Sequence, residues 1–240
     1  MQRVMRRRTE GVLSSDDLVP SVIEAADAHD PRRVIAMLEP LVLERRRQRI
    51  LQVAGARLGS VTVVFDAPHD PFNGAAVLRT CEAFGVHRVH VVERRESFLA
   101  AGSVTRNAHK WLDVRAHKGA APAIAELRAG GMRLVGAHPE GKLLPGDLSA
   151  IARLAIVVGN ERDGITDDLM AACDDTVRVP MRGMVESLNV SVTCAVLLSH
   201  ATVGRPGDLD EAARTQLYAR GLYFSVQRAQ EVLNLPPQQP

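Results

Sequence analysis

The sequence is poor in cysteine, and its few cysteines stand far apart. Cys81, Cys173 and Cys194 are the only three among 240 residues, and none forms a CxxC pair. CxxC spacing is the usual mark of a structural zinc site or a redox pair, so neither is predicted. We expect the three to be reduced, small core residues, as is typical of a cytosolic protein.

Long apolar runs are absent too. Hydrophobic residues make up 46% of the chain, but no run approaches the roughly 18 residues that a membrane-spanning helix needs. The basic start, MQRVMRRR, is followed by no apolar segment, so no secretory signal is predicted. We therefore expect a cytoplasmic protein that does not bind membranes.

A large net charge is also missing, since the formal value is only +2. The basic residues are unevenly placed, however: ten Arg and no Lys lie within residues 1–50. Two interpretations stay open for such clusters: solvated helix faces balanced by acidic residues, or surfaces that contact phosphate groups. The larger cluster holds Arg45, Arg46, Arg47 and Arg49.

The hydrophobic pattern divides the chain into three parts. Residues 1–57 read as a helical, Arg-rich N-terminal extension. Residues 58–203 alternate short apolar runs with helices. Residues 204–240 start with a Gly- and Pro-rich linker and read as a C-terminal helical extension with a tail.

Several helix boundaries can be predicted in the two extensions. An Ala-rich stretch near 19–29 precedes Pro31, and a long amphipathic run follows it with a break at Pro40. In the C-terminal extension, two short helices are predicted near 208–219 and 222–233. The extensions are thus expected to be helical apart from the linker after residue 203 and a disordered PPQQP tail.

The middle part is predicted to be an α/β domain. Its apolar runs are rich in the β-branched residues of buried strands, and they alternate with helix candidates. This alternation favours a mostly parallel sheet with helices on both faces. The strand candidates are 61–65, 88–92, 112–116, 133–137, 154–159 and 176–180, and the helix candidates are 74–84, 120–130, 166–173 and 188–203.

The usual nucleotide-binding fingerprints are missing from this domain. No GxGxxG follows the first strand, so the ordinary dinucleotide-binding turn is absent. The segment GAHPEGKL, ending at Leu143, nearly spells a phosphate-binding P-loop. Leu143 has no hydroxyl for a magnesium ion, and Pro145 and Gly146 follow where such a loop needs a helix. We therefore do not expect an NTPase.

Two polar residues stand out in HDPFNGAAVLRTCEAFGV, residues 69–86, which follows the first strand. Asn73 is placed to cap the helix and Gly85 to end it. Arg79 emerges in the middle of this helix among small residues. It either pairs with Glu82, three residues later, or leaves room for another molecule beside it.

Polar residues also follow two later strands. VVGNERDGIT, residues 157–166, places Glu161 after a strongly apolar strand, and VPMRGMVESLNVSV places Ser187 and Asn189 before an apolar helix. The second segment is either an elaborate helix cap or a binding loop. Because open α/β sheets bind ligands at the carboxyl ends of their strands, we predict one ligand crevice at that edge. It contains no metal-binding set and no Ser-His-Asp or Cys-His arrangement. Its predicted lining is Asn73, Arg79, Glu161, Ser187 and Asn189.

At these residues the sequence resembles a known family. NGAAVLRTCEAFGV, VVGNERDGI and VPMRGMVESLNVSV are similar, in order and spacing, to the three signature motifs of the SpoU-type RNA ribose 2′-O-methyltransferases, a branch of the SPOUT class. The resemblance covers about residues 43–202, and the third motif is the most specific. The chain is most similar to the TrmH-like tRNA (guanosine-2′-O)-methyltransferases, as HKW at 109–111 and LYARGLYFSVQRAQEVL near the C-terminus also indicate.

The resemblance implies a fold that composition does not show. Members of this family have a deep C-terminal trefoil knot and form homodimers whose active sites lie near the subunit interface. Knots are otherwise nearly absent from proteins, so this expectation rests on the family. It implies that the loop 179–187 holds S-adenosylmethionine and that the helix 188–203 packs into the knot and the dimer interface.

The resemblance also implies roles for single residues. Arg79 matches the family's proposed catalytic arginine. Asn73, Glu161, Ser187 and Asn189 match conserved polar positions that shape the cleft. The cofactor is expected to lie against backbone groups near Ala137, Gly159, Ile165, Val179, Met181 and Leu188.

The chemistry of Arg79 leaves alternatives open. A ribose 2′-hydroxyl is a poor nucleophile, and a guanidinium is a feeble base because it stays protonated in proteins. Either a phosphate of the bound RNA assists deprotonation, or Arg79 positions the RNA and stabilises developing negative charge. The sulfonium already makes the methyl group electrophilic, so no metal is expected.

Two function classes remain, an enzyme and an RNA-binding homologue without catalysis, and the intact motif residues favour the enzyme. Extensions at both ends favour tRNA as the substrate, specifically the invariant guanosine of the D-loop. An rRNA ribose or a pyrimidine of the tRNA anticodon loop stays open. We expect Arg45, Arg46, Arg47 and Arg49 to contact the RNA.

Overall fold

The structure is a computed structural model. It describes residues 12–14, 26–94, 99–101, 108–160 and 162–234. The helix predicted near 19–29 falls largely outside these residues, as does the end of the C-terminal tail. No described helix is both long and apolar enough to cross a membrane.

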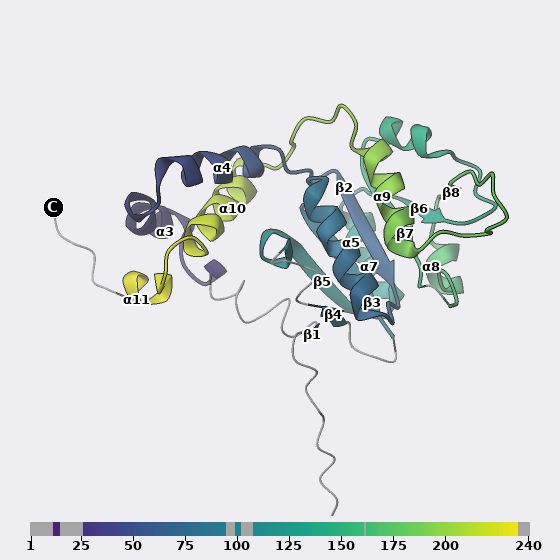
Figure 1. Cartoon of the computed structure of the whole chain (residues 1–240), viewed down its shortest axis with the longest axis horizontal. Coiled ribbons are helices and arrows are strands. Elements are labelled where there is room, and N and C mark those ends of the chain that lie inside the picture. The colour runs from purple at the N-terminus through teal and green to yellow at the C-terminus, as the bar shows by residue number, and fades with distance from the viewer. Residues whose placement is uncertain (1–11, 15–25, 95–98, 102–107, 161, 235–240) are drawn as a thin grey trace, which may run out of the picture.

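A parallel six-stranded sheet forms the centre of the protein (Figure 1). Its strand order is β5-β3-β2-β7-β6-β8, and every neighbouring pair is parallel. Each predicted strand overlaps one of these, so the predicted parallel sheet is confirmed. The strands are β2 (Val61–Asp66), β3 (Arg88–Glu93), β5 (Asp113–Lys118), β6 (Arg133–Ala137), β7 (Leu154–Val158) and β8 (Asp175–Val177).

Helices cover both faces of this sheet (Figure 1). On one face, α5 (Pro71–Ala83) and α9 (Val190–Ala201) pack over the central strands, with the 3-10 helix η3 (Pro145–Ala150) beside α9. The other face carries α7 (Ala120–Ala129) and α8 (Asp167–Ala171). Strands β2 and β7 are buried along their whole length, which explains their unbroken apolar runs.

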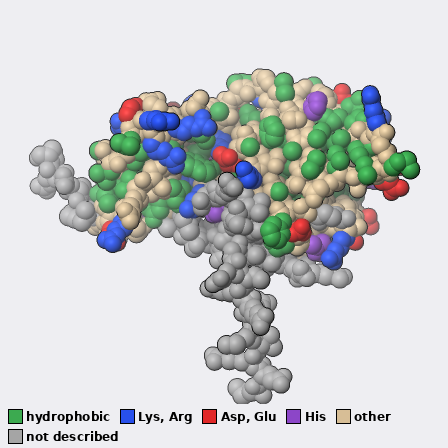
Figure 2. Space-filling model, viewed as in Figure 1, with side chains coloured by type: hydrophobic (Ala, Val, Ile, Leu, Met, Phe, Trp, Pro, Cys, Tyr) green, Lys and Arg blue, Asp and Glu red, His purple; other side chains and the backbone are tan. Residues whose placement is uncertain are grey.

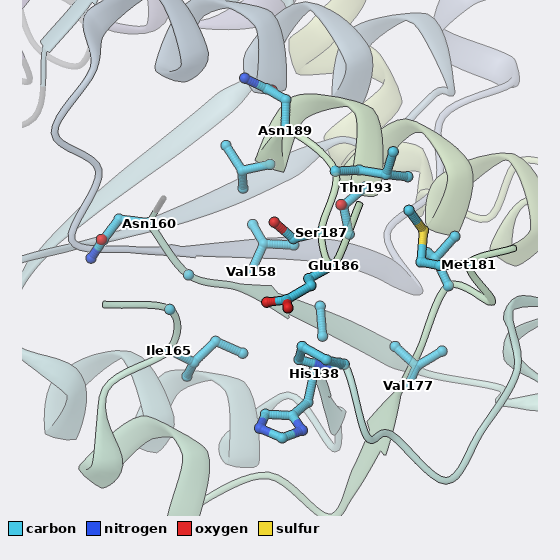
Figure 3. Close-up of a pocket in the computed structure, with 17 residues that line it drawn as sticks. His138, Val158, Asn160, Ile165, Val177, Met181, Glu186, Ser187, Asn189 and Thr193 are labelled. Carbon is cyan, nitrogen blue, oxygen red and sulfur yellow. The ribbon is translucent and has the colours of Figure 1, made fainter. Parts of the chain in front are cut away.

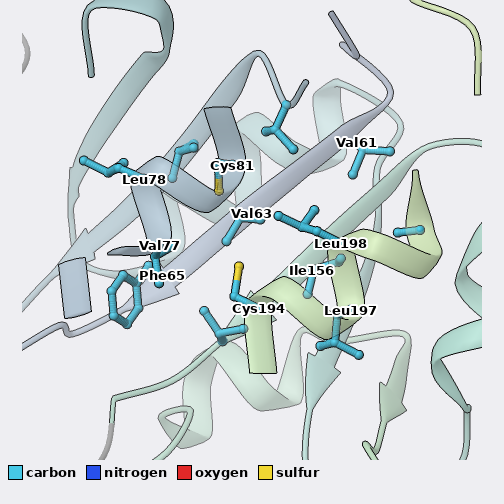
Figure 4. Packing of buried hydrophobic residues seen from close by; sticks show 14 of the residues in the cluster. Val61, Val63, Phe65, Val77, Leu78, Cys81, Ile156, Cys194, Leu197 and Leu198 are labelled. Carbon is cyan, nitrogen blue, oxygen red and sulfur yellow. The ribbon is translucent and has the colours of Figure 1, made fainter. Parts of the chain in front are cut away.

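The cysteines are packing residues in this core. Cys81 on α5 and Cys194 on α9 are fully buried between the two helices and the sheet (Figure 4). Cys173 is half-buried, and all three are free thiols. Burial raises the pKa of the Cys173 thiol to about 11. The prediction of small core residues is therefore confirmed for Cys81 and Cys194, whereas Cys173 is only partly buried, and the reduced state stays a prediction.

Helix α5 starts earlier than predicted. Asp70 is its N-cap, because its side chain accepts a hydrogen bond from the backbone N–H of Phe72 at 2.9 Å. Pro71 takes the first helical position, where its missing N–H costs nothing. The prediction that Asn73 caps this helix is therefore wrong. At the other end, Gly85 follows the C-cap at a φ of 78°, as predicted.

A short antiparallel pair was not predicted. Strands β1 (Val12–Ser14) and β4 (Leu99–Ala101) pair with Leu13 opposite Ala100. Each has only three residues, too few for an alternating pattern to stand out in the sequence.

Helices from the two ends of the chain pack together (Figure 1). Helices α3 (Pro31–Leu38) and α4 (Glu44–Gly55) meet α10 (Glu211–Tyr223) and α11 (Ala229–Leu233) around a second apolar cluster. The predicted break at Pro40 is confirmed, because the 3-10 helix η1 (Glu39–Leu41) interrupts the run there.

Helix α10 runs further than predicted, through Gly221 to Tyr223. A Cβ on Gly221 would lie 2.4 Å from Cγ2 of Ile50, so this glycine allows α4 to approach and does not end the helix. The neighbouring Arg220 is buried, and its Nε donates a hydrogen bond to Oδ1 of Asp27 at 3.1 Å. Close packing thus overrides the local signal for a helix end.

Candidate active site

A cavity of about 410 Å³ opens at the carboxyl ends of β6 and β7 (Figure 3). This is the edge at which open α/β sheets bind ligands, and the volume is that of a small-molecule site. Three segments form its walls: the turn after β6, the loop from β7 to α8, and the segment from β8 into α9.

All six predicted cofactor residues line this one cavity. They come from three separate parts of the chain, which only the fold brings together. Ser187 and Asn189, two of the predicted cleft residues, line it as well. The six are Ala137, Gly159, Ile165, Val179, Met181 and Leu188.

The loop between β7 and α8 folds back tightly on itself. A Cβ on Gly159 would lie 2.0 Å from the carbonyl carbon of Gly164, so only glycine fits there. Asn160 is buried, and its Oδ1 accepts hydrogen bonds from the backbone N–H groups of Arg162 and Asp163, both at 2.9 Å. Glu161, the predicted cleft residue of this loop, lies outside the described residues.

Asn189 joins two of the sequence motifs. Its Oδ1 accepts a hydrogen bond from the backbone N–H of Ser191 at 2.8 Å, so it is the N-cap of α9. Its Nδ2 donates a hydrogen bond to Oδ1 of Asn73 on α5 at 3.0 Å. The helix-cap interpretation is therefore confirmed, and because the capping residue also lines the cavity, the binding-loop interpretation stays a prediction.

Arg79 lies on α5, outside the cavity wall. It is exposed, and it forms no ion pair with any residue in the described part of the chain. Glu82 pairs instead with the buried guanidinium of Arg57, whose Nη2 lies 2.9 Å from Oε1 of Glu82. The Arg79–Glu82 pair, one of two alternatives in the sequence, is therefore not formed.

Two further ionisable side chains line the cavity. Glu186 points into it, toward His138 (Figure 3). Neither was predicted to line the site. His138 directly follows Ala137, a predicted cofactor residue, and Glu186 directly precedes Ser187, a predicted cleft residue. Among the described lining residues, Glu186 is the only acid, so it gives a largely apolar cavity a negative charge.

A second group of residues has the composition of a metal site but lies elsewhere. Ligand atoms of His90, His117 and Glu126 lie within 4.8 Å of one another on β3, β5 and α7. The two imidazoles hydrogen-bond each other at 2.9 Å, and Glu126 also pairs with Arg88 at 3.5 Å. Burial lowers the pKa of His90 to about 3, so this ring is neutral. The hydrogen bond between the two imidazoles and the ion pair of Glu126 with Arg88 therefore explain why these side chains lie together.

The predicted RNA-binding arginines all lie on α4, where Figure 2 shows blue side chains gathered. Arg45, Arg46 and Arg49 are exposed, while Arg47 is half-buried and forms an ion pair with Glu44. The interpretation of a solvated, balanced helix face thus applies to Arg47.

Arg46 lies beside an aromatic ring. Its guanidinium carbon lies 5.7 Å from the centroid of Trp111. Its Nε donates a hydrogen bond to Oγ of Ser225, just after α10, at 3.1 Å. Arg46, Arg49 and Trp111 also line a small cavity of about 180 Å³ with Glu82 of α5. The basic face of α4 therefore adjoins the helix that carries Arg79.

The fold and the cavity define an α/β protein that binds a small molecule at the carboxyl edge of a parallel sheet. A comparison with protein families makes this class specific. The model of the SpoU rRNA Methylase family matches residues 60–199, more than half of the chain, and the protein belongs to this family. The resemblance of the three motifs is thereby confirmed.

Individual relatives agree with this assignment. The tRNA (guanosine(18)-2′-O)-methyltransferase of Escherichia coli K12 is 32% identical over 157 residues, which are 65% of this chain and 69% of the relative. The A. aeolicus TrmH/SpoU tRNA modifying enzyme has a TM-score of 0.68 at 24% identity, covering 77% of this chain and 98% of its own, and shares the fold. The SpoU methyltransferase AviRb of Streptomyces viridochromogenes, solved with the cofactor AdoMet, has a TM-score of 0.52 at 25% identity, covering 62% and 60%.

Proposed function

We propose that the protein transfers a methyl group from S-adenosylmethionine to a ribose 2′-hydroxyl of RNA, with the conserved D-loop guanosine of tRNA as its target. The observation that carries this proposal is the single cavity lined by all six residues matched to the family's cofactor site. Relatives support it, since one is named as a tRNA (guanosine(18)-2′-O)-methyltransferase and another was solved with AdoMet.

The cavity fits that cofactor chemically. Ile165, Val179 and Leu188 offer apolar contacts, and the tight turn at Gly159 exposes backbone groups to a ligand. The carboxylate of Glu186 complements a cationic group. When bound, the sulfonium of the cofactor supplies an electrophilic methyl group. The residues of this chain then have to bind and orient the ribose hydroxyl, whose proton must also be removed.

Arg79 acts on the RNA in this proposal. It stands six residues after Asn73 on α5, or about 9 Å along the helix, and Asn73 bonds to Asn189 at the cavity. A guanidinium stays protonated, so Arg79 positions the RNA and stabilises negative charge, while an RNA phosphate can assist the loss of the proton.

We propose that residues 58–203 form a methyltransferase domain with a deep trefoil knot. Tight crossing of chain segments supports this topology. A Cβ on Gly141 would lie 2.3 Å from the carbonyl carbon of Val177, and Leu143 pairs with Val177. After β8 at the sheet edge, the chain returns as α9 and packs between η3 and α5.

We further propose a homodimer formed through α9 and the loop before it. Exposed apolar side chains gather there: Val192 is 47% exposed, Val185 60% and Met184 100%. Figure 2 shows hydrophobic side chains spread over this region. Such a patch is typical of a surface that another chain covers, and a second copy would lie beside the cavity.

The two terminal parts of the chain, residues 1–57 and 204–240, form the RNA-binding region in this proposal, and helices α3, α4, α10 and α11 are its described core. Arg45, Arg46 and Arg49 are exposed there, and cations beside Trp111 suit contact with phosphates and bases. Arg47 is assigned to the same surface, although its positive charge is partly balanced by the ion pair with Glu44. With tRNA as its substrate, the protein belongs in the cytoplasm.

Purified protein provides the direct test. We expect calorimetry to detect S-adenosylmethionine binding in EDTA, since no step needs a metal. Prefolded tRNA and an rRNA fragment, each supplied with labelled cofactor, should show methylation of the tRNA D-loop guanosine. Cofactor binding without transfer to either RNA would favour the non-catalytic homologue. Transfer to the rRNA fragment alone would move the target to rRNA.

A further inference from the structure

Asp66, the last residue of β2, is a fully buried carboxylate with several donors around it. Its Oδ2 accepts hydrogen bonds from the backbone N–H of Thr166 at 2.8 Å and from the Thr166 hydroxyl at 2.6 Å. Its Oδ1 accepts a hydrogen bond from Nε of Arg94 at 3.2 Å. A buried charge needs such partners to persist. Both oxygens of this one are used to hold Thr166 and Arg94.

Arg94 extends the same cluster to α8. Its Nη1 and Nη2 donate to the two carboxylate oxygens of Asp168 at 3.0 and 2.7 Å, and Nη2 also donates to the Thr166 hydroxyl. Hydrogen bonding to Arg94 lowers the pKa of Asp168 to about 2. Charged partners therefore tie the ends of β2 and β3 to the first turn of α8.

The cluster lies directly behind one wall of the cavity. Ile165 lines the cavity and Thr166, the next residue, is held by Asp66, which does not itself line it. The loop that ends at Thr166 is fixed at its start by Asn160. Asp66 thus fixes the end of a tight loop. In this loop, a Cβ placed on Gly159 would lie 2.0 Å from the carbonyl carbon of Gly164.

We infer that Asp66, together with Arg94, is a positioning residue that sets the Ile165–Thr166 wall for cofactor binding. This inference rests on the proposed function, because it takes the ligand of the cavity to be S-adenosylmethionine. Loss of the carboxylate allows the wall to move, and a misplaced wall costs affinity without any change in the groups that touch the ligand.

The test compares Asp66→Asn with a control at an exposed acid that has the same kinds of partner, Asp174→Asn. Asp174 also accepts from one backbone N–H, that of Leu134 at 2.8 Å, and from one arginine, Arg128, at 2.7 and 2.9 Å. It stands after α8, away from the cavity lining. We expect Asp66→Asn to weaken S-adenosylmethionine binding by about tenfold or more, as removal of a charged hydrogen-bond acceptor does, and Asp174→Asn to change it less than about twofold.

The kinetic constants KM and kcat distinguish a positioning role of Asp66 from a general loss of structure. Asp66→Asn should raise the KM for the cofactor, with kcat at saturating cofactor within about threefold of the wild type. Melting temperatures of both variants show that each is folded during the assay. If Asp66→Asn does not fold, Thr166→Val replaces it, because this variant keeps the backbone N–H contact and loses only the hydroxyl. It should weaken cofactor binding by about threefold to tenfold.

Each result bears on a definite claim. A folded Asp66→Asn or Thr166→Val protein that binds the cofactor like the wild type would overturn the inference and leave the proposed function standing. An equal loss in Asp174→Asn would overturn it too, since the effect would then be general. A wild-type protein that does not bind S-adenosylmethionine would remove the proposed function, and the inference with it.

Discussion

The two loops that flank the cavity differ in how the rest of the chain holds them. The loop 159–166 is fixed at both ends, by Asn160 and by Asp66. In the segment 180–187, every residue is exposed, and no backbone hydrogen bond joins this segment to another described residue. One wall of the cavity is therefore built by the chain itself, and the opposite wall is left open.

This difference separates two tasks of the site. A fixed wall is preorganised and loses little entropy when a ligand binds. An open wall has low local stability and can adapt to a ligand or a second subunit. In our proposal, both walls contact the cofactor, and the fixed wall sets its position. The open wall also adapts to the dimer partner, while Asn73 and Arg79 serve the RNA. The following predictions test that division.

The largest effect is expected at Arg79. Arg79→Ala should lower methyl transfer by about 10²–10³-fold, the usual cost of removing a group that stabilises transition-state charge. Cofactor affinity should stay unchanged, because Arg79 is not part of the cavity wall. Single-turnover transfer and calorimetry measure the two quantities. Arg128→Ala, an exposed helix arginine on the other face of the sheet, is the control. Near-normal turnover would make Arg79 a structural residue.

A smaller loss is expected when the proposed dimer face is charged. Val192→Arg should convert the dimer to monomers and lower methyl transfer by about tenfold, because burial of a valine is worth about 1.5–3 kcal/mol and a buried arginine costs more. Analytical ultracentrifugation gives the mass. Leu43→Arg is the control, since Leu43 is 82% exposed at the start of α4, away from α9. A wild-type monomer, or a dimer that survives Val192→Arg, would place the interface elsewhere.

Asn189 tests the junction between the two walls. Asn189→Ala loses a helix cap and the hydrogen bond to Asn73, so cofactor affinity should fall by about fivefold to tenfold, or about 1 kcal/mol in total. Asp210→Ala also removes a cap, because Asp210 accepts from the backbone N–H of Ala213 at 2.7 Å, but outside the cavity. Its stability should fall and its cofactor affinity should not. Equal affinity losses would mean that the cap alone matters.

The smallest effect concerns salt. Replacing Arg45, Arg46, Arg47 and Arg49 with Gln should flatten the slope of log affinity against log salt by about 0.7–0.9 per lost phosphate contact. Arg47 contributes least, because Glu44 already pairs with it. Cofactor binding should not change. Measurements with tRNA and an rRNA fragment side by side show whether the effect is specific. An unaltered slope on both RNAs would remove α4 from the binding surface.

Much of the fold could be predicted from local patterns. Short apolar runs rich in β-branched residues, such as 154–159, favour buried strands over helices, so the parallel sheet was predicted from them. Where packing decided the outcome, local signals failed. Gly221 reads as a helix end, but α10 continues through it because Ile50 needs the space. Asn73 reads as a cap, but Asp70 takes that place and leaves the Asn73 amide to accept from Asn189.

Fewer features of the site than of the fold could be predicted from local sequence patterns. The cavity residues were predicted through a family resemblance, since nothing in the local sequence says that Ala137 and Met181 face the same space. Contacts between polar residues far apart in the chain were not predicted at all. Asp66 and Thr166 are separated by 100 residues, and a single sequence gives no signal that pairs them. His138 and Glu186 were missed although both adjoin predicted residues.

The central claim is that this protein methylates a ribose in tRNA. Mass-spectrometric mapping of 2′-O-methylated nucleotides in RNA from a deletion strain tests it most directly. Strains complemented with the wild type and with Arg79→Ala serve as controls. We predict that one methylated guanosine in the tRNA D-loop disappears on deletion and returns only with the wild type. An unchanged 2′-O-methylation map of tRNA in the deletion strain would contradict the account.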